Sequence, residues 1–279
     1  MARRILLAAA LMLALPASLA QDLVRAPRQD GAATPMRVFE PLGSGCVPLA
    51  LISPGAGGSE DGYGYLAQAL QKNGWRAVVM GHPESGPAAL RSDVRKGGMR
   101  GGLAQLVADP SAHEGRLMDI AAALAWAGQR CKPPFAALIG HSMGAATVMI
   151  EAGARDKLGV TGRDRFDAYV ALSPQGPGSI FPEHAWSGIH KPVLIMTGTR
   201  DEALDSSWQW RTVPFDGLPP GCKWLVVIDG ATHLNFAGHG LSGNTEKITL
   251  AEIAAFLDGV HAGRCGAPVQ LEGATAHRK

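Results

Sequence analysis

A hydroxyl, a carboxylate and an imidazole with the chemistry for acyl transfer lie in three separate stretches of the sequence. Ser142 stands in the pattern G-x-S-x-G within LIGHSMGAATV, between a short apolar run and a small-residue helical segment. Asp201 follows the apolar run PVLIMTG, and His233 follows the apolar run KWLVVID. A serine hydroxyl is a weak nucleophile at neutral pH and needs a base, which a carboxylate orients. The three residues predict a nucleophilic Ser142, with His233 as general base and Asp201 as orienting acid.

The surroundings of Ser142 also predict where an oxyanion would bind. G-x-S-x-G between a strand and a helix is typical of a nucleophile elbow, in which Gly140 and Gly144 avoid clashes with the neighbouring strand and helix. The amide of Met143 is then one donor to the oxyanion. We assign the second donor to Ala56 in SPGAGGS, since this loop follows an apolar strand and does not have the spacing of a phosphate-binding loop.

Two neighbouring residues are alternatives for the acid and the base. Asp205 lies four residues beyond Asp201, further into the loop, and His239 lies six residues beyond His233. Both are further from the end of the preceding apolar run, so Asp201 and His233 are the preferred assignments.

Strand-length apolar runs alternate with helical patterns along the chain. Continuous apolar strands separated by helices predict an α/β fold, with a mostly parallel sheet and helices on both faces. The expected strands are 47–53, 76–80, 135–140, 166–173, 192–198 and 223–229, the last of the sheet. The expected helices are 65–74, one opened by a capping box of Ser111 and Glu114, 142–154, and one from Thr249 capped with Glu252. In such a sheet, functional residues gather beyond the carboxyl ends of the strands, where Ser142, Asp201 and His233 are expected to lie.

The composition is that of a globular protein. Hydrophobic residues make up 46% and charged residues 18% of 279 residues, and the net charge is only +2. No cluster of Lys and Arg interleaves with aromatic residues, so nucleic acid is not an expected partner. With neither repeats nor a linker, residues 21–279 are expected to form a single catalytic domain.

Residues 1–20 have the organisation of a signal peptide. Arg3 and Arg4 precede an apolar run, and small residues at Ser18 and Ala20 form a cleavage signal. The apolar run is too short to span a bilayer, so we expect a secreted protein, periplasmic or extracellular, that begins at Gln21 and has no stable membrane anchor. Four cysteines in an exported chain indicate disulfides. The sequence contains no C-x-x-C pair that would suggest a zinc site.

These motifs resemble those of the α/β-hydrolases, closest to the exported dienelactone-hydrolase-like serine esterases, a group that includes relatives of platelet-activating-factor acetylhydrolase and bacterial polyester hydrolases. The resemblance spans about 47–257 and depends on SPGAGGSEDGYGYLAQALQKNGW, GHSMGAAT, TGTRDE and DGATHLNF. It implies an α/β-hydrolase fold and the cleavage of carboxylic esters through an acyl-enzyme on Ser142, without cofactor or metal. The sequence departs from the family in two ways: Pro54-Gly55 replaces the usual His-Gly of the oxyanion loop, and Ser142 replaces the cysteine of dienelactone hydrolases proper.

The resemblance also narrows the disulfide pairing, which four cysteines alone leave at three arrangements. In α/β-hydrolases the strands that follow Cys46 and Cys131 are neighbours, and the final helix returns antiparallel to the strand that follows Cys222. The resemblance therefore implies the pairs Cys46–Cys131 and Cys222–Cys265, both far from Ser142.

The substrate is the least determined property. Tyr63, Met143, Trp186 and the irregular passage 82–110 are candidates for the pocket, and the glycine-rich 97–103 for a lid. The expected substrate is a small-molecule or polymer ester, with acyl length, alcohol and oligomeric state left open. An acyltransferase that uses the same acyl-enzyme, or a non-catalytic binding protein on the same fold, are the alternative functions.

Overall fold

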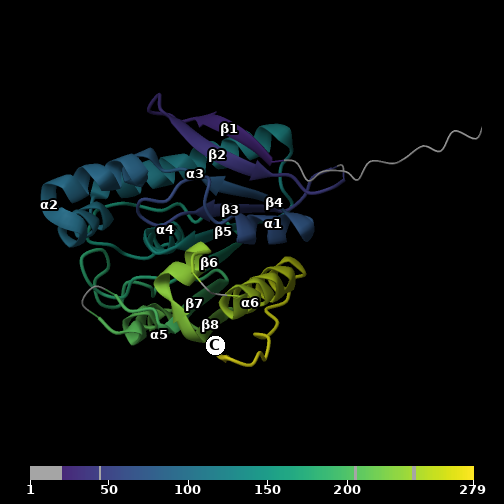
Figure 1. Cartoon of the computed structure of the whole chain (residues 1–279). Helices are drawn as coiled ribbons and strands as arrows, with labels where there is room; N and C mark the ends of the chain where they lie inside the picture. Colours follow the sequence, from purple (N-terminus) through teal and green to yellow (C-terminus); the bar gives the residue numbers. More distant parts are fainter. Residues whose placement is uncertain (1–20, 44, 204–205, 241–242) are drawn as a thin grey trace, which may run out of the picture.

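The computed structural model describes residues 21–43, 45–203, 206–240 and 243–279, so the expected signal peptide and Asp205 lie outside the described residues. The described strands form one nine-stranded sheet in the order β1-β2-β4-β3-β5-β6-β7-β8-β9 (Figure 1).

The centre of the sheet is parallel, as predicted. Its strands are β3 (Leu49–Ser53), β4 (Arg76–Met80), β5 (Ala136–His141), β6 (Ala168–Leu172), β7 (Val193–Arg200) and β8 (Lys223–Thr232). Every residue of β3, β4, β5 and β6 is buried, because helices cover both faces of this part of the sheet. Because β3 to β8 are parallel, the carboxyl ends of β5, β7 and β8 lie on the same side of the sheet.

Three antiparallel strands toward the two edges of the sheet were not predicted, and the expectation that 223–229 is the last strand is wrong. β1 (Gln21–Pro27) and β2 (Ala33–Phe39) extend the sheet beyond β4, and β9 (Ala274–Arg278) pairs with β8. β1 and β9 are largely exposed, and β2 alternates between buried and half-buried residues. Such strands lack the continuous apolar run of the buried strands, so their signal in the sequence is weak.

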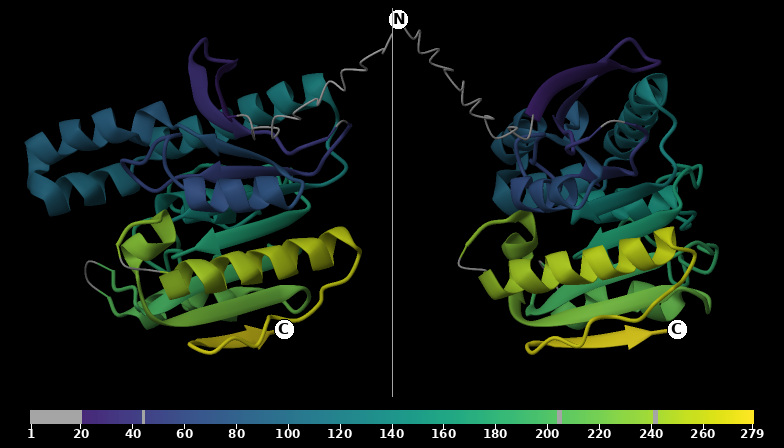
Figure 2. Two further views of the ribbon diagram at one scale, coloured as in Figure 1. Left: turned by 45° about the vertical axis from the view of Figure 1, so that its right-hand side comes forward. Right: turned by 90° about the vertical axis from the view of Figure 1, so that its right-hand side faces the viewer.

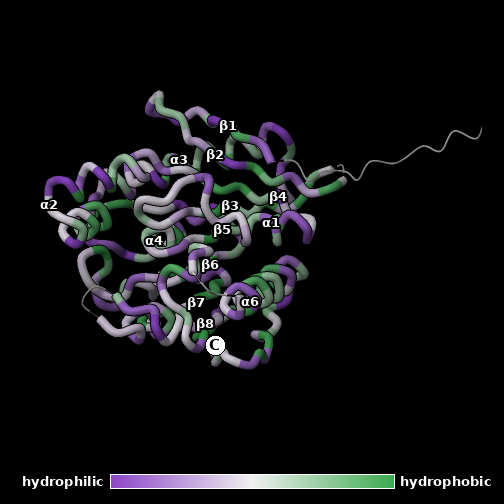
Figure 3. Tube along the Cα trace, viewed as in Figure 1, coloured by the Kyte–Doolittle hydropathy of each residue, from purple (hydrophilic) through white to green (hydrophobic). Residues whose placement is uncertain are grey.

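Helices cover both faces of the sheet, as predicted (Figure 2). α1 (Gly64–Lys72) and α6 (Gly243–His261) pack on one face, and α3 (Pro110–Arg130), α4 (Met143–Glu151) and α5 (Val213–Gly217) on the other. Short 3-10 helices are η1 (Pro83–Ser85), η2 (Trp208–Arg211) and η3 (His233–Ala237). Hydrophobic residues concentrate along the central strands in Figure 3, whereas the outer turns of the helices are mixed.

Residues 82–110 are mostly helical, which corrects the expectation of an irregular passage. After η1, α2 (Pro87–Val107) runs to Gly98, where φ is 69° and ψ is 174°, and then folds back as a second helical arm. A side chain at Gly102 would overlap the backbone of Asp93 and Val94, so the two arms approach closely only because glycine stands there. The glycines hid the helix from a periodicity analysis, but they make a helical hairpin.

Two expected helix starts are also wrong. α3 begins at Pro110, and its N-cap is Asp109, whose carboxylate accepts a bond from the amide of Ser111; Ser111 and Glu114 form no capping box. α6 begins at Gly243, so Thr249 lies inside the helix. The Glu252 carboxylate accepts a bond from the amide of Val269 instead of capping α6.

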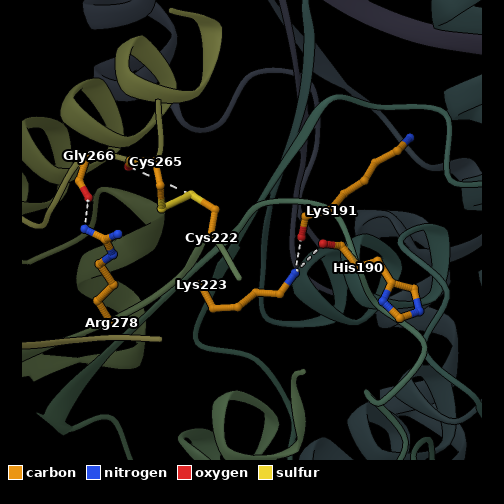
Figure 4. Close-up of a disulfide and its surroundings, with 7 residues drawn as sticks. All are labelled: His190, Lys191, Cys222, Lys223, Cys265, Gly266 and Arg278. Carbon is orange, nitrogen blue, oxygen red and sulfur yellow. Dashed lines mark hydrogen bonds between the residues drawn. A yellow bond between two sulfur atoms is a disulfide. The ribbon is translucent and has the colours of Figure 1, made fainter. Parts of the chain in front are cut away.

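The disulfides are the two pairs that the resemblance implied. Cys46 and Cys131 have Cα atoms 5.6 Å apart, and those of Cys222 and Cys265 are 5.3 Å apart. Figure 4 shows the second bridge at the start of β8, where Lys223 donates to the backbone carbonyls of His190 and Lys191. Two disulfides are typical of proteins in an oxidising extracellular or periplasmic compartment. No helix in the described part of the chain is both long and apolar enough to cross a membrane.

Candidate active site

Ser142 stands at a strained turn between β5 and α4. Its φ is 55° and its ψ is −120°, a conformation that a residue with a side chain seldom adopts. A side chain at Gly140 would overlap the carbonyl oxygen of Gly144, and one at Gly144 would overlap the carbonyl oxygen of Ser53. Both glycines are therefore required by close packing, which is the geometry of a nucleophile elbow.

The structure brings the three candidate residues into one hydrogen-bonded line. The Oγ atom of Ser142 lies 2.9 Å from Nε2 of His233, and Nδ1 of His233 lies 2.8 Å from Oδ1 of Asp201. Asp201 is fully buried, whereas the His233 side chain is 31% exposed and so accessible to a substrate. The imidazole that contacts Ser142 is thus His233; the alternative, His239, is an exposed residue whose backbone carbonyl accepts a bond from Asn235.

The Asp201 carboxylate is held by groups besides the imidazole. Thr197 donates its hydroxyl to Oδ2 at 2.9 Å, and Nε of the buried Arg211 lies 2.9 Å from Oδ1. Burial alone would raise the pKa of Asp201, but the His233 hydrogen bond and the Arg211 charge together lower it below its ordinary value. The carboxylate is therefore ionised at neutral pH and able to orient His233.

The 53–59 loop lies against Ser142 where the second oxyanion donor was expected. A Cβ at Gly55 would lie 3.3 Å from Cβ of Ser142, so the backbone of the loop and the nucleophile are in close contact. Met143 is the first residue of α4, and the first N–H groups of a helix have no intrahelical acceptor. The 53–59 loop and the start of α4 both adjoin Ser142, and the amides of Ala56 and Met143 remain the predicted oxyanion donors.

A buried arginine anchors the same loop. Arg116 of α3 is fully buried and donates to the carbonyl oxygens of Pro54 at 2.7 Å and Gly55 at 3.4 Å, and to the hydroxyl of Ser85 at 2.8 Å. Burial lowers the pKa of Arg116 to about 10, so the guanidinium keeps its charge at neutral pH. These bonds anchor the loop in a protein where Pro54 replaces the usual histidine.

A second serine–histidine–aspartate chain lies beneath this loop. Oγ of Ser53 is 2.9 Å from Nε2 of His82, and Nδ1 of His82 is 2.8 Å from Oδ2 of Asp119. All three residues are buried, which leaves no access for a substrate. Burial, with the nearby Arg116 charge, lowers the pKa of His82 to about 4, so its imidazole is neutral at neutral pH, and the three residues pack under the loop.

Two clefts meet at the candidate nucleophile. The Trp210 cleft, of about 480 Å³, lies between the second arm of α2 and the residues around η2. The Leu234 cleft, of about 530 Å³, lies between the 53–59 loop, α2 and η3. Ser142, His233 and Leu103 line both. Among the described residues, no group of three His, Cys, Asp or Glu side chains is placed to hold a metal ion.

Most of the surface that lines each cleft is apolar. The Trp210 cleft is also lined by Ala104, Val107, Gln175, Ser179, Glu202, Ala203, Ser206, Trp210 and Arg211. The Leu234 cleft is also lined by residues of the 53–63 segment and by Leu90, Met99, His141, Leu234, Ala237 and His239. Met99 and Leu234 are 68% and 60% exposed, so two large hydrophobic side chains stand at the rim of this cleft.

Of the three residues expected to line the substrate pocket, only Tyr63 lies in the wall of a cleft, whereas Met143 and Trp186 are buried in the core. Tyr63 lies in the wall of the Leu234 cleft, but its hydroxyl is bonded to the protein. Met143 is buried beneath α2 beside Leu106 and Ala112. The expectation for Trp186 is wrong: it is 1% exposed and packs against Phe181, with ring centroids 5.5 Å apart, in the core under α4. The segment after β6 folds back onto the sheet, so this aromatic ring is part of the core and not of a cleft wall.

Sequence reasoning missed Arg211, Arg116 and His141. The first two act on residues brought close by the fold, and an isolated arginine in a helix carries no periodic signal. His141 adjoins Ser142 in the elbow motif, so its position was a signal, but only the structure shows its contacts.

Comparisons with known proteins define the class of fold. No family model matches the sequence, and none of the curated proteins matches it. The chain is similar to the crystal structure of a protein named "Putative Dienelactone Hydrolase" from Klebsiella pneumoniae subsp. pneumoniae, with a TM-score of 0.66. The match covers 86% of this chain and 99% of that chain at 14% identity, which establishes the fold alone.

The chain therefore has an α/β-hydrolase fold. More specifically, the fold is dienelactone-hydrolase-like, as the sequence motifs implied.

Proposed function

We propose that this protein is a secreted serine hydrolase that cleaves carboxylic esters through an acyl-enzyme on Ser142. The observation that carries the proposal is the line of contacts from Ser142 to His233 at 2.9 Å and on to buried Asp201 at 2.8 Å, beginning at a strained turn. A serine in an ordinary surface loop would need neither the strain nor an oriented imidazole. A non-catalytic binding protein would have no use for this arrangement.

The geometry supports a two-step reaction. Oγ of Ser142 attacks the ester carbonyl carbon while its proton passes to Nε2 of His233, and the amides of Ala56 and Met143 bind the resulting oxyanion. Collapse of this intermediate breaks the bond to the alcohol, which leaves with the proton from His233. Water then attacks the acyl-enzyme, gives its proton to His233, and releases the acid as the serine regains its proton. Asp201 stays ionised and stabilises the imidazolium that forms in each step.

The substrate in this proposal is a small-molecule or polymer ester with a substituent on each side of the carbonyl. Each cleft has the volume of an ordinary ligand site, and both open from Ser142. An apolar lining favours uncharged acyl and alcohol groups. The signal-peptide pattern of residues 1–20 and the two disulfides support export.

Active-site labelling and hydrolysis test the proposal together. The protein should react with a fluorophosphonate and hydrolyse members of a p-nitrophenyl ester series of increasing acyl length. Ser142→Ala should abolish labelling and lower kcat about a million-fold, with a similar loss for His233→Ala and about ten-thousand-fold for Asp201→Asn. Ser187→Ala changes an exposed serine whose hydroxyl donates to the His184 carbonyl at 3.5 Å; this matched control should keep full activity.

Two results would contradict the proposal. Labelling that persists in Ser142→Ala would place the reactive residue elsewhere. Acyl transfer to an added alcohol that outruns hydrolysis would make the protein an acyltransferase using the same acyl-enzyme.

A further inference from the structure

A chain of three hydrogen bonds connects the 53–59 loop to η3 on the inner side of the active site. The amide of Gly55 donates to the hydroxyl of Tyr63 at 3.1 Å. This hydroxyl lies 2.8 Å from Nδ1 of His141, and Nε2 of His141 lies 3.0 Å from the carbonyl oxygen of His233. One end of the chain is the Pro54–Gly55 peptide, one residue before Ala56, and the other is the backbone carbonyl of the candidate base.

The direction of every bond in this chain is fixed by its ends. A backbone amide only donates and a carbonyl oxygen only accepts. Nε2 of His141 must therefore carry the proton that reaches the His233 carbonyl, which leaves Nδ1 of the neutral ring as an acceptor. The Tyr63 hydroxyl then donates to Nδ1 and accepts from Gly55. All groups are satisfied in a single arrangement, with no alternative tautomer.

The protonation states that this arrangement needs are those that burial favours. Tyr63 and His141 are 6% and 4% exposed. Burial raises the pKa of the Tyr63 phenol to about 12. Burial, with the His233 ring 4.7 Å away between centroids, holds the pKa of His141 well below its ordinary value. The tyrosine stays protonated and His141 stays neutral across the neutral range.

Tyr63 occupies its position at a cost in backbone strain. Its φ is 56°, in the left-handed region, and it lies between Gly62 and Gly64. Glycine at this position would relieve the strain. A tyrosine kept in a glycine conformation between two glycines indicates that its side chain has a role.

The Ala56 amide belongs to the peptide that follows the one held by Tyr63. The Tyr63 hydroxyl accepts a hydrogen bond from the N–H of Gly55, while Arg116 donates one to the carbonyl oxygen of Gly55. In a trans peptide the N–H points opposite to the C=O, and the described chain has no cis peptide. With Gly55 O turned toward Arg116, the N–H of Ala56 points away from Arg116.

We propose that Tyr63 and His141 are positioning residues that fix the Ala56 oxyanion donor and the His233 base in one geometry. The proposal rests on the serine-esterase function above. The hydrogen bonds of these two side chains go to the backbones of Gly55 and His233 and not to the reacting atoms. Because the geometry matters most when the oxyanion has formed, their loss should lower kcat and leave KM nearly unchanged.

The test compares two buried tyrosines whose hydroxyls each make two hydrogen bonds, one within this chain of bonds and one outside it. Tyr63→Phe removes the hydroxyl that accepts from Gly55 and donates to His141. Tyr169→Phe is its matched control, because the buried Tyr169 hydroxyl accepts from the amide of Phe166 at 3.3 Å and donates to Asp164 at 2.8 Å, at the amino end of β6. Both variants should lower the melting temperature by similar amounts. Only Tyr63→Phe should lower kcat, by about 10- to 100-fold, with KM within about twofold.

His141 provides a second arm. Nε2 of a glutamine side chain can take the place of the imidazole Nε2, so His141→Gln keeps a donor for the His233 carbonyl, whereas His141→Leu does not. His141→Gln should retain more kcat than His141→Leu. The kcat of the double variant Tyr63→Phe/His141→Leu should be within about twofold of the kcat of His141→Leu alone, because the effects of residues that act as a unit are not additive.

Each outcome decides for or against the proposal. An unchanged kcat in Tyr63→Phe, with a melting temperature lowered as in Tyr169→Phe, would reduce the pair to a structural role and overturn it. A raised KM at constant kcat would make Tyr63 a substrate contact and overturn it as well. Wild-type protein that fails to react with a fluorophosphonate would overturn the esterase function, and this inference with it.

Discussion

Nε of Arg211 lies 2.9 Å from Oδ1 of Asp201, the same carboxylate oxygen that lies 2.8 Å from Nδ1 of His233. The arginine is 4% exposed and also donates to the carbonyl oxygens of Asp201, Ser173 and Pro174. One guanidinium therefore balances the buried acid and fixes the loops after β6 and β7, which carry the wall of the Trp210 cleft.

Replacing Arg211 should damage both stability and chemistry. Arg211→Gln leaves the buried Asp201 without its counter-charge, so the pKa of Asp201 should rise. As the pH is lowered, the variant should therefore lose activity at a higher pH than the wild type does. Breaking a buried pair in this way costs about 3–5 kcal/mol of unfolding free energy. Urea unfolding and a pH profile of kcat measure the two effects. An unchanged acid limb would show that Arg211 does not keep Asp201 ionised.

The two clefts should recognise different ends of an ester. Ala104→Trp fills the Trp210 cleft and Ala237→Trp fills the Leu234 cleft, each beside the shared residues Ser142 and His233. One variant should lower kcat/KM at least about tenfold for esters with a long acyl chain and the other for esters with a bulky alcohol, since each blocks one apolar site. Kinetics on two series, one varied in acyl length and one in alcohol, make the assignment. If both variants discriminated against the same series, the substrate would not cross Ser142 from one cleft to the other.

Buried histidines should make the protein less stable in mild acid. Burial lowers the pKa of His82 and of His113 to about 4. In the unfolded chain an ordinary histidine takes up its proton near pH 6.5, so between about pH 6.5 and 4 the unfolded state binds more protons than the folded state. The unfolding free energy should therefore decrease as the pH is lowered through this window, by at most about 1.4 kcal/mol per pH unit for each histidine.

His113 offers the cleanest test of this dependence. Its Nε2 donates to the Val107 carbonyl at 2.9 Å and its Nδ1 has no partner in the described structure, so His113→Gln can keep the one hydrogen bond. Denaturant unfolding between pH 4 and 7 should show a smaller slope for the variant than for the wild type. Identical slopes would mean that His113 is not held neutral by the fold.

The disulfides should contribute stability without contributing to the reaction. Both lie at the amino ends of the strands, whereas Ser142 lies at the carboxyl end of β5. The bridges close segments with sequence separations of 85 and 43, which the chain-entropy relation converts to about 4–5 kcal/mol each as an upper estimate. Reduction, or the pair of changes Cys222→Ser and Cys265→Ser, should lower the melting temperature while kcat at 25 °C is retained. Loss of kcat in a reduced protein that is still folded would contradict this separation.

Much of the fold and the identity of the central site residues follow from local sequence. The buried strands are largely apolar runs, as is typical of strands buried on both faces of a sheet, so β3 to β8 were predictable. Ser142, Asp201 and His233 each follow one of these strands directly, and parallel strands bring their carboxyl ends to one edge. Their proximity was therefore predicted, and the structure places them within hydrogen-bonding distance.

The remaining features depend on contacts between segments far apart in the chain. Arg211, Arg116 and His141 acquire their partners only when separate loops meet, and Trp186 enters the core only because its segment folds back onto the sheet. The edge strands and α2 escaped prediction because half-exposed strands and glycine-rich helices carry little periodicity. The sequence by itself thus determined which residues could react and on which strands they stand. Tertiary structure alone decided how they are held, because the burial and pairing of a polar side chain depend on neighbours that local sequence does not specify.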